Sequence, residues 1–257
     1  MRTILAALAA LFLAASPALA DEGEYDSLLG RYVHANADGV NRVDYAAWSA
    51  NAADRAALDN YVNELAAQRP SSFARARAFA YWINLYNAAT LKVVLARYPV
   101  ASIRDIRSEG VLDPRGLIGP WRTRLVEVEG RRLSLDDIEH AILRPTFRDP
   151  RVHYAINCAS IGCPNLAGKA YRGASLEAQL DAGARAYVNS GRGLSIAGGR
   201  LVASRIYQWF AEDFGGSEPA VIAHLRRYAQ GDTAKALTDG ARIAGYAYDW
   251  NLNDASP

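Results

Sequence analysis

The sequence predicts an α+β fold, a predominantly helical single domain with a small, mostly antiparallel sheet. Three observations support this prediction. Apolar residues recur at helical spacing over several long stretches, and short apolar runs flank Gly-Gly and Glu-Gly pairs as they do in β-hairpins. The chain also shows no internal repeat and no sustained heptads. Residues 21–257 suffice for one globular domain whose core does not need disulfides to form.

The first twenty residues, MRTILAALAALFLAASPALA, indicate a cleaved secretory signal of bacterial type. They carry one positive charge at Arg2, then an apolar run, and then Ala18-Leu19-Ala20 before Asp21. The apolar run is short for a bilayer, and no later stretch offers the roughly 20 apolar residues that a span needs. We therefore expect a secreted or periplasmic protein without a membrane span.

The charge pattern argues against a polyanionic partner. Lys and Arg number 29 against 27 Asp and Glu, and no run of five or more basic residues occurs. Such a balance is typical of a mixed, solvated surface, so nucleic acid and anionic membranes are not expected as partners. The expected partner is a small molecule or a peptide, which the sequence does not identify.

The first part of the chain predicts three helices. The stretches YDSLLGRYVHANA and ADRAALDNYVNELAA have apolar residues at helical spacing, and the segment from Ser72 to Arg97 is longer and more apolar. Because no charge stands between Arg77 and Lys92, we expect this third helix to run through the interior and to end before Pro99.

Beyond Pro99 the pattern predicts strands as well as helices. Two short strands are expected around Glu129-Gly130, followed by the helix LDDIEHAILR, which Ser134 and Asp137 cap and Pro145 ends. A strand is expected over Val152–Asn157. The remaining elements are a helix in SLEAQLDAGARAYVNS, a hairpin in GLSIAGGRLVAS, helices over residues 204–214 and 219–228, and a late strand in GYAYDWNLN.

Both cysteines lie in the stretch HYAINCASIGCP. In an oxidising compartment a Cys158–Cys163 disulfide is the default for two such thiols, and closing so short a loop contributes about 2 kcal/mol. A metal site is an alternative, since His153 and His140 could complete four ligands, but the second ligand pair lacks a typical motif. We expect neither a metal nor another cofactor.

The third interpretation makes Cys158 a nucleophile with a histidine as its base. His140 follows Asp136 by four residues on the predicted helix, so the carboxylate can orient the imidazole. The alternative is that Asp136 merely favours the helix dipole and that His140 is a surface residue. His153 can serve as the base only if the chain bends at Asn157.

Polar residues inside apolar stretches form a second group of candidates. Asn84 and Asn87 share a face of the predicted interior helix and need hydrogen-bond partners there. They either tie down a neighbouring loop, such as the one around Cys158, or support a developing oxyanion. Asp213 is expected to cap the turn at Gly215 or to accept from Arg144. Three tryptophans are expected mainly as core aromatics: Trp82, Trp209 and Trp250.

Several stretches together resemble a known family: YWINLYNA, LSLDDIEHAILR, DPRVHYAINCASIGCP, IYQWFAEDFG and YDWNLN. They resemble the domain of unknown function 547, and the likeness runs over residues 79–253. The resemblance implies an exported bacterial member and no particular activity. It also implies a firmer requirement for Cys158 than for Cys163, where other members can have serine.

Two functional hypotheses follow from these observations. The first is a cysteine-dependent hydrolase or acyl transferase, in which Cys158 attacks, His140 or His153 is the base, and Asp136 or Asn157 orients it. Asn84 or Asn87 would then support the oxyanion. The second is a non-enzymatic exported binding or scaffold domain, in which the Cys158–Cys163 disulfide is structural.

Overall fold

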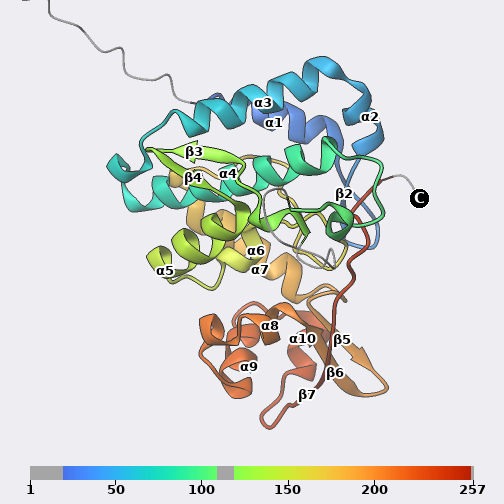
Figure 1. Ribbon diagram of the computed structural model, residues 1–257. Helices are drawn as coiled ribbons and strands as arrows, with labels where there is room; N and C mark the ends of the chain where they lie inside the picture. Colours follow the sequence, from blue (N-terminus) through green and yellow to red (C-terminus); the bar gives the residue numbers. More distant parts are fainter. Residues whose placement is uncertain (1–19, 109–118, 256–257) are drawn as a thin grey trace, which may run out of the picture.

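Helices dominate the part of the chain that the computed structural model describes, residues 20–108 and 119–255. Residues 1–19 of the expected leader therefore lie outside the described residues. Helices α1 to α7 lie in the upper and middle parts of the view in Figure 1, and α8 to α10 lie below them. The helices are α1 (Glu22–Tyr32), α2 (Tyr45–Ala50), α3 (Ala52–Ala66), α4 (Arg75–Leu95), α5 (Arg144–Phe147), α6 (Val152–Ala155), α7 (Leu176–Val188), α8 (Ile206–Trp209), α9 (Glu218–Arg226) and α10 (Gly231–Ala236).

The strands of the described residues pair into three small sheets. Two sheets are antiparallel hairpins, β1–β2 and β3–β4, and in the third β6 pairs with antiparallel β5 and parallel β7. The predicted helix-dominated α+β fold with mostly antiparallel pairing is thereby confirmed. The strands are β1 (Val33–Ala35), β2 (Asn41–Val43), β3 (Val126–Val128), β4 (Arg131–Leu133), β5 (Leu194–Ala197), β6 (Arg200–Ser204) and β7 (Ile243–Ala247).

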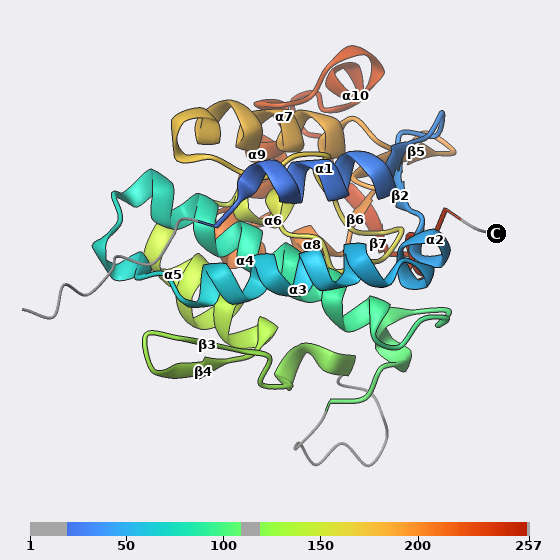
Figure 2. The same ribbon diagram turned by 90° about the horizontal axis from the view of Figure 1, so that it is seen from above.

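Helix α4 crosses the interior, as its uncharged stretch predicts. Every residue from Phe79 to Leu91 is buried, so the helix packs on all sides. Helix α3 packs along α4 and α1 packs along α3, and Figure 2 shows the three running side by side. A helix surrounded in this way can present polar side chains only to groups that are themselves inside the protein.

Asn84 and Asn87 use this position to hold two distant segments. The Asn84 amide donates to the carbonyl of Tyr171 and accepts from its N–H, both at 2.8 Å. The Asn87 amide donates to the Ala155 carbonyl at 2.9 Å and accepts from the Asn157 N–H at 2.8 Å. Each side chain therefore pairs with backbone groups that would otherwise lack partners inside the core.

Two hairpins form where the sequence predicts them. Glu129 and Gly130 connect β3 to β4 with φ values of 48° and 75°, and Gly198 and Gly199 connect β5 to β6 with 57° and 75°. Two consecutive positive φ values suit the right-handed twist of the flanking strands. Glycine supplies three of these four residues because it adopts this conformation at little cost.

The expected helix after Ser134 forms, but with a different geometry. Its predicted cap is present, because the Asp137 carboxylate accepts from the Ser134 N–H at 2.8 Å and the Asp137 N–H donates to the Ser134 hydroxyl at 3.2 Å. Residues Asp137–Leu143 then form π-helical turns that continue into α5. The prediction that Pro145 ends the helix is wrong, since proline in the first turn of α5 loses no hydrogen bond. Wide π turns are rare and often occur at functional sites.

The prediction of a strand over Val152–Asn157 is also wrong. Residues Val152–Ala155 form the single turn α6, and Ile156 follows in extended conformation. The turn is started locally, because the Asp149 carboxylate accepts from the N–H and the guanidinium of Arg151 at 2.9 and 3.0 Å. Alternating polar and apolar residues therefore reflect burial from several sides here, rather than the two faces of a strand.

Three further boundaries differ from the expectations. Helix α1 ends at Tyr32, because Val33 to Ala35 pair with β2. The expected helix over residues 204–214 divides into α8 and a 3-10 turn at Ala211–Phe214. The late strand stops at Ala247 and leaves the following residues free to reach the body of the molecule.

The buried apolar residues gather in two neighbouring cores. The larger core lies around α1, α3 and α4, and the smaller around α7, α8, α9 and β6. After β7 the chain returns to the larger core, where Leu252 is buried and Asp254 bridges to Val43. This return places the segment from Tyr248 to Trp250 across the junction between the two cores.

Replacing Asn87 by alanine is expected to destabilise the protein by about 2–4 kcal/mol, because the Ala155 carbonyl and the Asn157 N–H lose their buried partner. Urea unfolding measures this loss. Asn63, exposed on α3, is the control, and Asn63→Ala should change the stability by less than about 0.5 kcal/mol. Equal effects of the two substitutions would contradict the bracing role.

Candidate functional site

A pocket of about 200 Å³ lies where the two cores meet. Helix α4, the π turns and α6 contribute residues from one side, and α8 and the segment after β7 contribute from the other. Junctions between structural units are common places for ligand sites. The lining comprises Tyr86, Trp121, Asp136, Glu139, His140, His153, Ile156, Cys158, Cys163, Pro164, Ile206, Trp209, Phe210, Tyr248 and Trp250.

Both cysteines line this pocket, and a disulfide joins them. Their Cα atoms are 6.2 Å apart, within the usual range for such a bridge. The predicted pairing is therefore present in the structure. Cys158 is partly exposed, whereas Cys163 retains 4% of its accessible surface. The sulfur of Cys158 is thus the more accessible of the two from the pocket.

The loop between the cysteines is held by bonds other than the disulfide. The Asn157 amide donates to the Pro164 carbonyl at 2.7 Å and accepts from the Ala159 N–H at 2.8 Å. The Gly162 N–H donates to the Asp249 carbonyl at 2.8 Å. A Cβ atom on Gly162 would lie 2.8 Å from the backbone of Asp249, so this approach requires glycine. Asn157 therefore shapes the loop instead of orienting a histidine.

Two hydroxyl groups lie against the sulfurs. The Tyr248 hydroxyl is 3.1 Å from Cys158 Sγ and 3.3 Å from Cys163 Sγ, and the Ser160 hydroxyl is 3.4 Å from Cys158 Sγ. Burial raises the pKa of Tyr248 far above its usual range, so this hydroxyl keeps its proton. The site therefore holds a protonated hydroxyl beside the disulfide that can donate a hydrogen bond to sulfur.

Aromatic rings form much of the pocket wall. The ring of Trp250 lies 5.7 Å from that of Trp209 and 5.9 Å from that of Trp121, at interplanar angles of 34° and 73°. Trp209 is 44% exposed and Trp250 is half-buried, so the expectation that these two are core residues is wrong, while Trp82 is buried as expected. Trp209 and Trp250 remain accessible because both side chains line the pocket.

A partly buried polar cluster joins His153, Arg144 and Asp213. His153 retains 3% of its accessible surface, and its Nε2 donates to Asp213 Oδ2 at 2.7 Å. Arg144 Nε donates to the same oxygen at 2.6 Å. Asp213 therefore accepts from Arg144, which is one of the two roles predicted for it. Burial raises the pKa of Asp213, but the hydrogen bonds from His153 and Arg144 outweigh it and hold that pKa well below its usual range. Asp213 therefore stays ionised and fixes the imidazole.

Glu139 is a carboxylate in the pocket with few partners. It retains 8% of its accessible surface and accepts from the Tyr86 hydroxyl at 3.4 Å. Its Oε1 lies 4.0 Å from His153 Nδ1. The π turn brings Glu139 to the pocket together with its neighbour His140. A carboxylate removed from water in this way is strongly disfavoured unless a positive group compensates it.

Asp136 and His140 form the pair that their spacing predicts. Asp136 Oδ1 lies 3.4 Å from His140 Nε2, and Arg144 lies 3.0 Å from the other ring nitrogen. The hydrogen bond that His140 donates to Asp136 raises the pKa of His140, and the same bond lowers the pKa of the Asp136 carboxyl. His140 is thus oriented and lines the pocket, but both of its ring nitrogens already have close polar neighbours.

The structure brings Cys158, His140, His153 and Asp136 to one pocket. Asn84 and Asn87 are not among its lining residues, and both amides are engaged with backbone groups. Two roles were predicted for these asparagines, holding a neighbouring loop or supporting an oxyanion. The observed contacts with backbone groups are those expected for holding a loop.

Sequence reasoning did not single out Glu139, Tyr248 or Trp121 as site residues. Glu139 stands in a helical stretch where acidic residues are common, so its burial gave no local signal. The stretch YDWNLN that contains Tyr248 entered the sequence analysis only through the predicted late strand, the family resemblance and Trp250. The contact of Tyr248 with Cys158 joins residues ninety positions apart, which no local pattern reveals.

Within residues 20–108 and 119–255, no three His, Cys, Asp or Glu side chains gather in a way that could hold a metal ion. The same part of the chain contains no helix with the length and hydropathy needed to cross a membrane.

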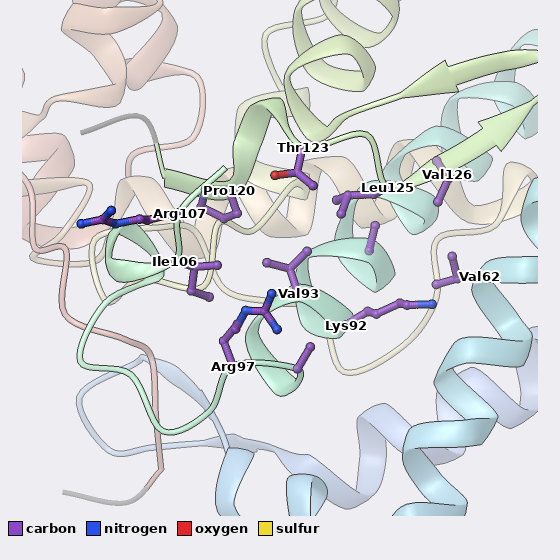
Figure 3. A pocket seen from close by; sticks show the side chains of 12 residues that line it. Val62, Lys92, Val93, Arg97, Ile106, Arg107, Pro120, Thr123, Leu125 and Val126 are labelled. Atoms are coloured by element: carbon purple, nitrogen blue, oxygen red, sulfur yellow. The ribbon is translucent and has the colours of Figure 1, made fainter. Parts of the chain in front are cut away.

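A second cavity of about 150 Å³ lies between α4 and the segment leading into β3. Figure 3 shows Val93 and Lys92 on one side of it and Pro120, Thr123 and Leu125 on the other. Its described lining contains no cysteine, histidine or carboxylate. The pocket at the disulfide is therefore the stronger candidate for chemistry.

Replacing Asp213 by asparagine should change how stability depends on pH. Because the pKa of Asp213 is lowered in the folded protein, its ionised form contributes stability above the unfolded pKa of about 4, and this is lost as the pH falls. Asp213→Asn should therefore be less stable at pH 7 and lose less stability on acidification than the unchanged protein. Urea unfolding between pH 7 and pH 3 measures this. Asp239→Asn, at an exposed site, is the control, and parallel curves for all three proteins would contradict the assignment.

Comparisons with known proteins match part of the chain to a protein family. Residues 70–188 match the model of a family described as protein of unknown function, DUF547. No curated protein and no solved structure matches the chain. The matched segment contains α4, the Glu139-His140 turn and the cysteine loop, so it covers much of the pocket. This match supports the DUF547 family, as the sequence motifs predicted.

Proposed function

We propose that the protein binds a small cationic organic molecule, an amine or a quaternary ammonium compound, in the pocket beside the disulfide. The observation that carries this proposal is Glu139, a buried carboxylate that borders the pocket, accepts one long hydrogen bond and lies 4.0 Å from His153 Nδ1. A cation in the pocket would compensate its charge at the place where water is largely excluded. Binding would then be the function, and the disulfide part of the wall.

The aromatic wall supports the same class of ligand. Cations are attracted to the faces of tryptophan and tyrosine by about 0.5–2 kcal/mol per contact. The rings of Trp209, Trp250 and Tyr248 are inclined to one another by 34° to 56°, so they offer faces in several directions instead of one flat platform. Arg104 already lies 5.2 Å from the centre of the Trp250 ring. This wall therefore suits a compact positive group better than a flat neutral ring.

The acidic residues of the pocket argue against an anionic ligand. Asp136 and Glu139 both line it, and Arg122 lies 3.6 Å from Asp136. A carboxylate or phosphate ligand would meet this negative charge in a medium that screens it poorly. We include secretion or a periplasmic location in the proposal, because disulfides persist in oxidising compartments.

Choline and its neutral isostere 3,3-dimethylbutan-1-ol test the proposal. Tryptophan fluorescence should report choline binding at least about tenfold tighter than the isostere, since only choline carries the charge that Glu139 compensates. Glu139→Gln should reduce choline affinity about tenfold and leave the isostere unaffected. Glu212→Gln, at an exposed carboxylate, is the matched control. Equal affinity for the two compounds would contradict a cation site.

A second candidate function is thiol-dependent hydrolysis or acyl transfer at Cys158. One observation favours it, namely that Cys158, His140 and His153 line one pocket. It requires an open bridge, because a sulfur in a disulfide is not a nucleophile. It also requires a histidine to exchange its present partner for the thiol, since His153 is bonded to Asp213 and His140 to Asp136.

Alkylation of the reduced protein tests this second candidate. If a histidine activates Cys158, iodoacetamide labelling should follow an apparent pKa clearly below the 8.5 of a free thiol. His140→Gln or His153→Gln should return that value toward 8.5. A labelling pKa of 8.5 or higher in the unchanged protein would argue that neither histidine acts as a base.

A further inference from the structure

We propose that the Cys158–Cys163 bridge is a dithiol–disulfide couple that exchanges with small-molecule thiols entering the pocket. Cys158 is the sulfur that is attacked, and Cys163 is the leaving thiolate. This activity needs an accessible sulfur and a stabilised leaving group, both of which the site provides. It does not depend on the cationic ligand, so either proposal can fail while the other holds.

The sulfur that is attacked must be accessible from the pocket, and Cys158 is more accessible than Cys163. Cys158 is partly exposed and borders the pocket, whereas Cys163 keeps 4% of its surface. Exchange requires that the incoming thiolate reach one sulfur, and access decides which of the two is attacked. A thiol in the pocket therefore meets Cys158 first.

The surroundings of Cys163 suit a leaving thiolate. Its sulfur accepts from the backbone N–H of Cys158 at 2.9 Å and lies 3.3 Å from the Tyr248 hydroxyl. Arg192 donates to the Cys163 carbonyl at 2.5 Å, so its guanidinium contacts the backbone of the cysteine loop. Hydrogen-bond donors and nearby positive charge favour the thiolate form of a cysteine. When Cys163 Sγ leaves with the electron pair of the broken bond, these donors can therefore stabilise its negative charge.

The exchange balances in two steps. A neutral thiol enters the pocket and loses its proton to water as its sulfur attacks Cys158 Sγ, the bond between the cysteine sulfurs breaks, and the electron pair of that bond passes to Cys163 Sγ. The product is a mixed disulfide between Cys158 and the thiol. A second thiolate then attacks the thiol-derived sulfur, which releases the small-molecule disulfide and leaves Cys158 as a thiolate. Two thiols are oxidised and one protein disulfide is reduced, with protons taken from water.

The loop should survive the opening of the bridge. Asn157 bonds to the carbonyl of Pro164 and the N–H of Ala159, and Gly162 bonds to Asp249, so the segment remains attached without the disulfide. The bridge itself closes a short loop and contributes only about a tenfold to hundredfold change in the folding equilibrium. The reduced cysteines therefore stay close together and can pair again.

Reduction of the native protein by 2-mercaptoethanol tests the proposal. Without denaturant, maleimide trapping and mass spectrometry should show both thiols appearing at a rate proportional to thiolate concentration. That rate should exceed the rate of global unfolding, measured in parallel by tryptophan fluorescence. Thiols that appear only as fast as the protein unfolds would overturn the proposal, because the bridge would then be closed to exchange in the fold.

Single-cysteine variants test which sulfur is attacked. Cys163→Ser leaves Cys158 accessible and should form a mixed disulfide with 2-hydroxyethyl disulfide. Cys158→Ser leaves the buried Cys163 and should react at least tenfold more slowly. Circular dichroism in the aromatic region establishes that both variants are folded. Equal rates, or a faster Cys163, would overturn the assignment of roles.

The Tyr248 hydroxyl is tested by a pair of tyrosine substitutions. Tyr248→Phe should slow reduction of the bridge about tenfold, because the leaving thiolate loses one donor. Tyr246→Phe, in β7 of the same segment, is the matched control and should leave the rate unchanged. A Tyr248→Phe rate equal to that of the unchanged protein would contradict stabilisation of the leaving thiolate by this hydroxyl.

Discussion

The hydrogen bonds of Asn87 are the contact on which the site depends. This amide projects from a helix that is buried on all sides and holds the backbone before Cys158 through Ala155 and Asn157. Because α4 is fixed by the larger core, the segment that it holds cannot shift without leaving buried backbone groups unpaired. The packing of α4 in the larger core therefore determines where the disulfide lies.

The second constraint is the return of the chain after β7. Backbone bonds from Ile161 and Gly162 to Asn251 and Asp249 fasten the cysteine loop to this last segment. The same segment brings Tyr248 and Trp250 to the pocket. The site is thus assembled from both cores, and its charged part, Asp213 with His153 and Arg144, also joins residues from both sides. The proposed binding pocket and the proposed reactive disulfide can share such a place because the loop that carries both cysteines is anchored by hydrogen bonds from both sides.

Local sequence signals predicted the elements that depend on local chemistry. The uncharged stretch in α4, the glycine turns of the hairpins and the cap at Ser134 each specify their structure through neighbours in sequence. The segment over Val152–Asn157 was mispredicted because Asp149 starts a helical turn, while the extended end is held by a side chain from α4. In the site, the Asp136–His140 pair and the cysteine bridge were predictable from spacing. The positions of Glu139, Tyr248 and Trp209 depend on contacts with residues far away in the sequence, which spacing does not encode.

Hydrogen exchange at the backbone amide of Asn157 tests this account most directly. This N–H donates to the side chain of Asn87 and belongs to no regular helix or strand, so local structure alone would leave it weakly protected. The account predicts exchange nearly as slow as that of the amides in the middle of α4. Exchange as fast as in the exposed loops would show that the amide of Asn87 does not hold the segment before Cys158.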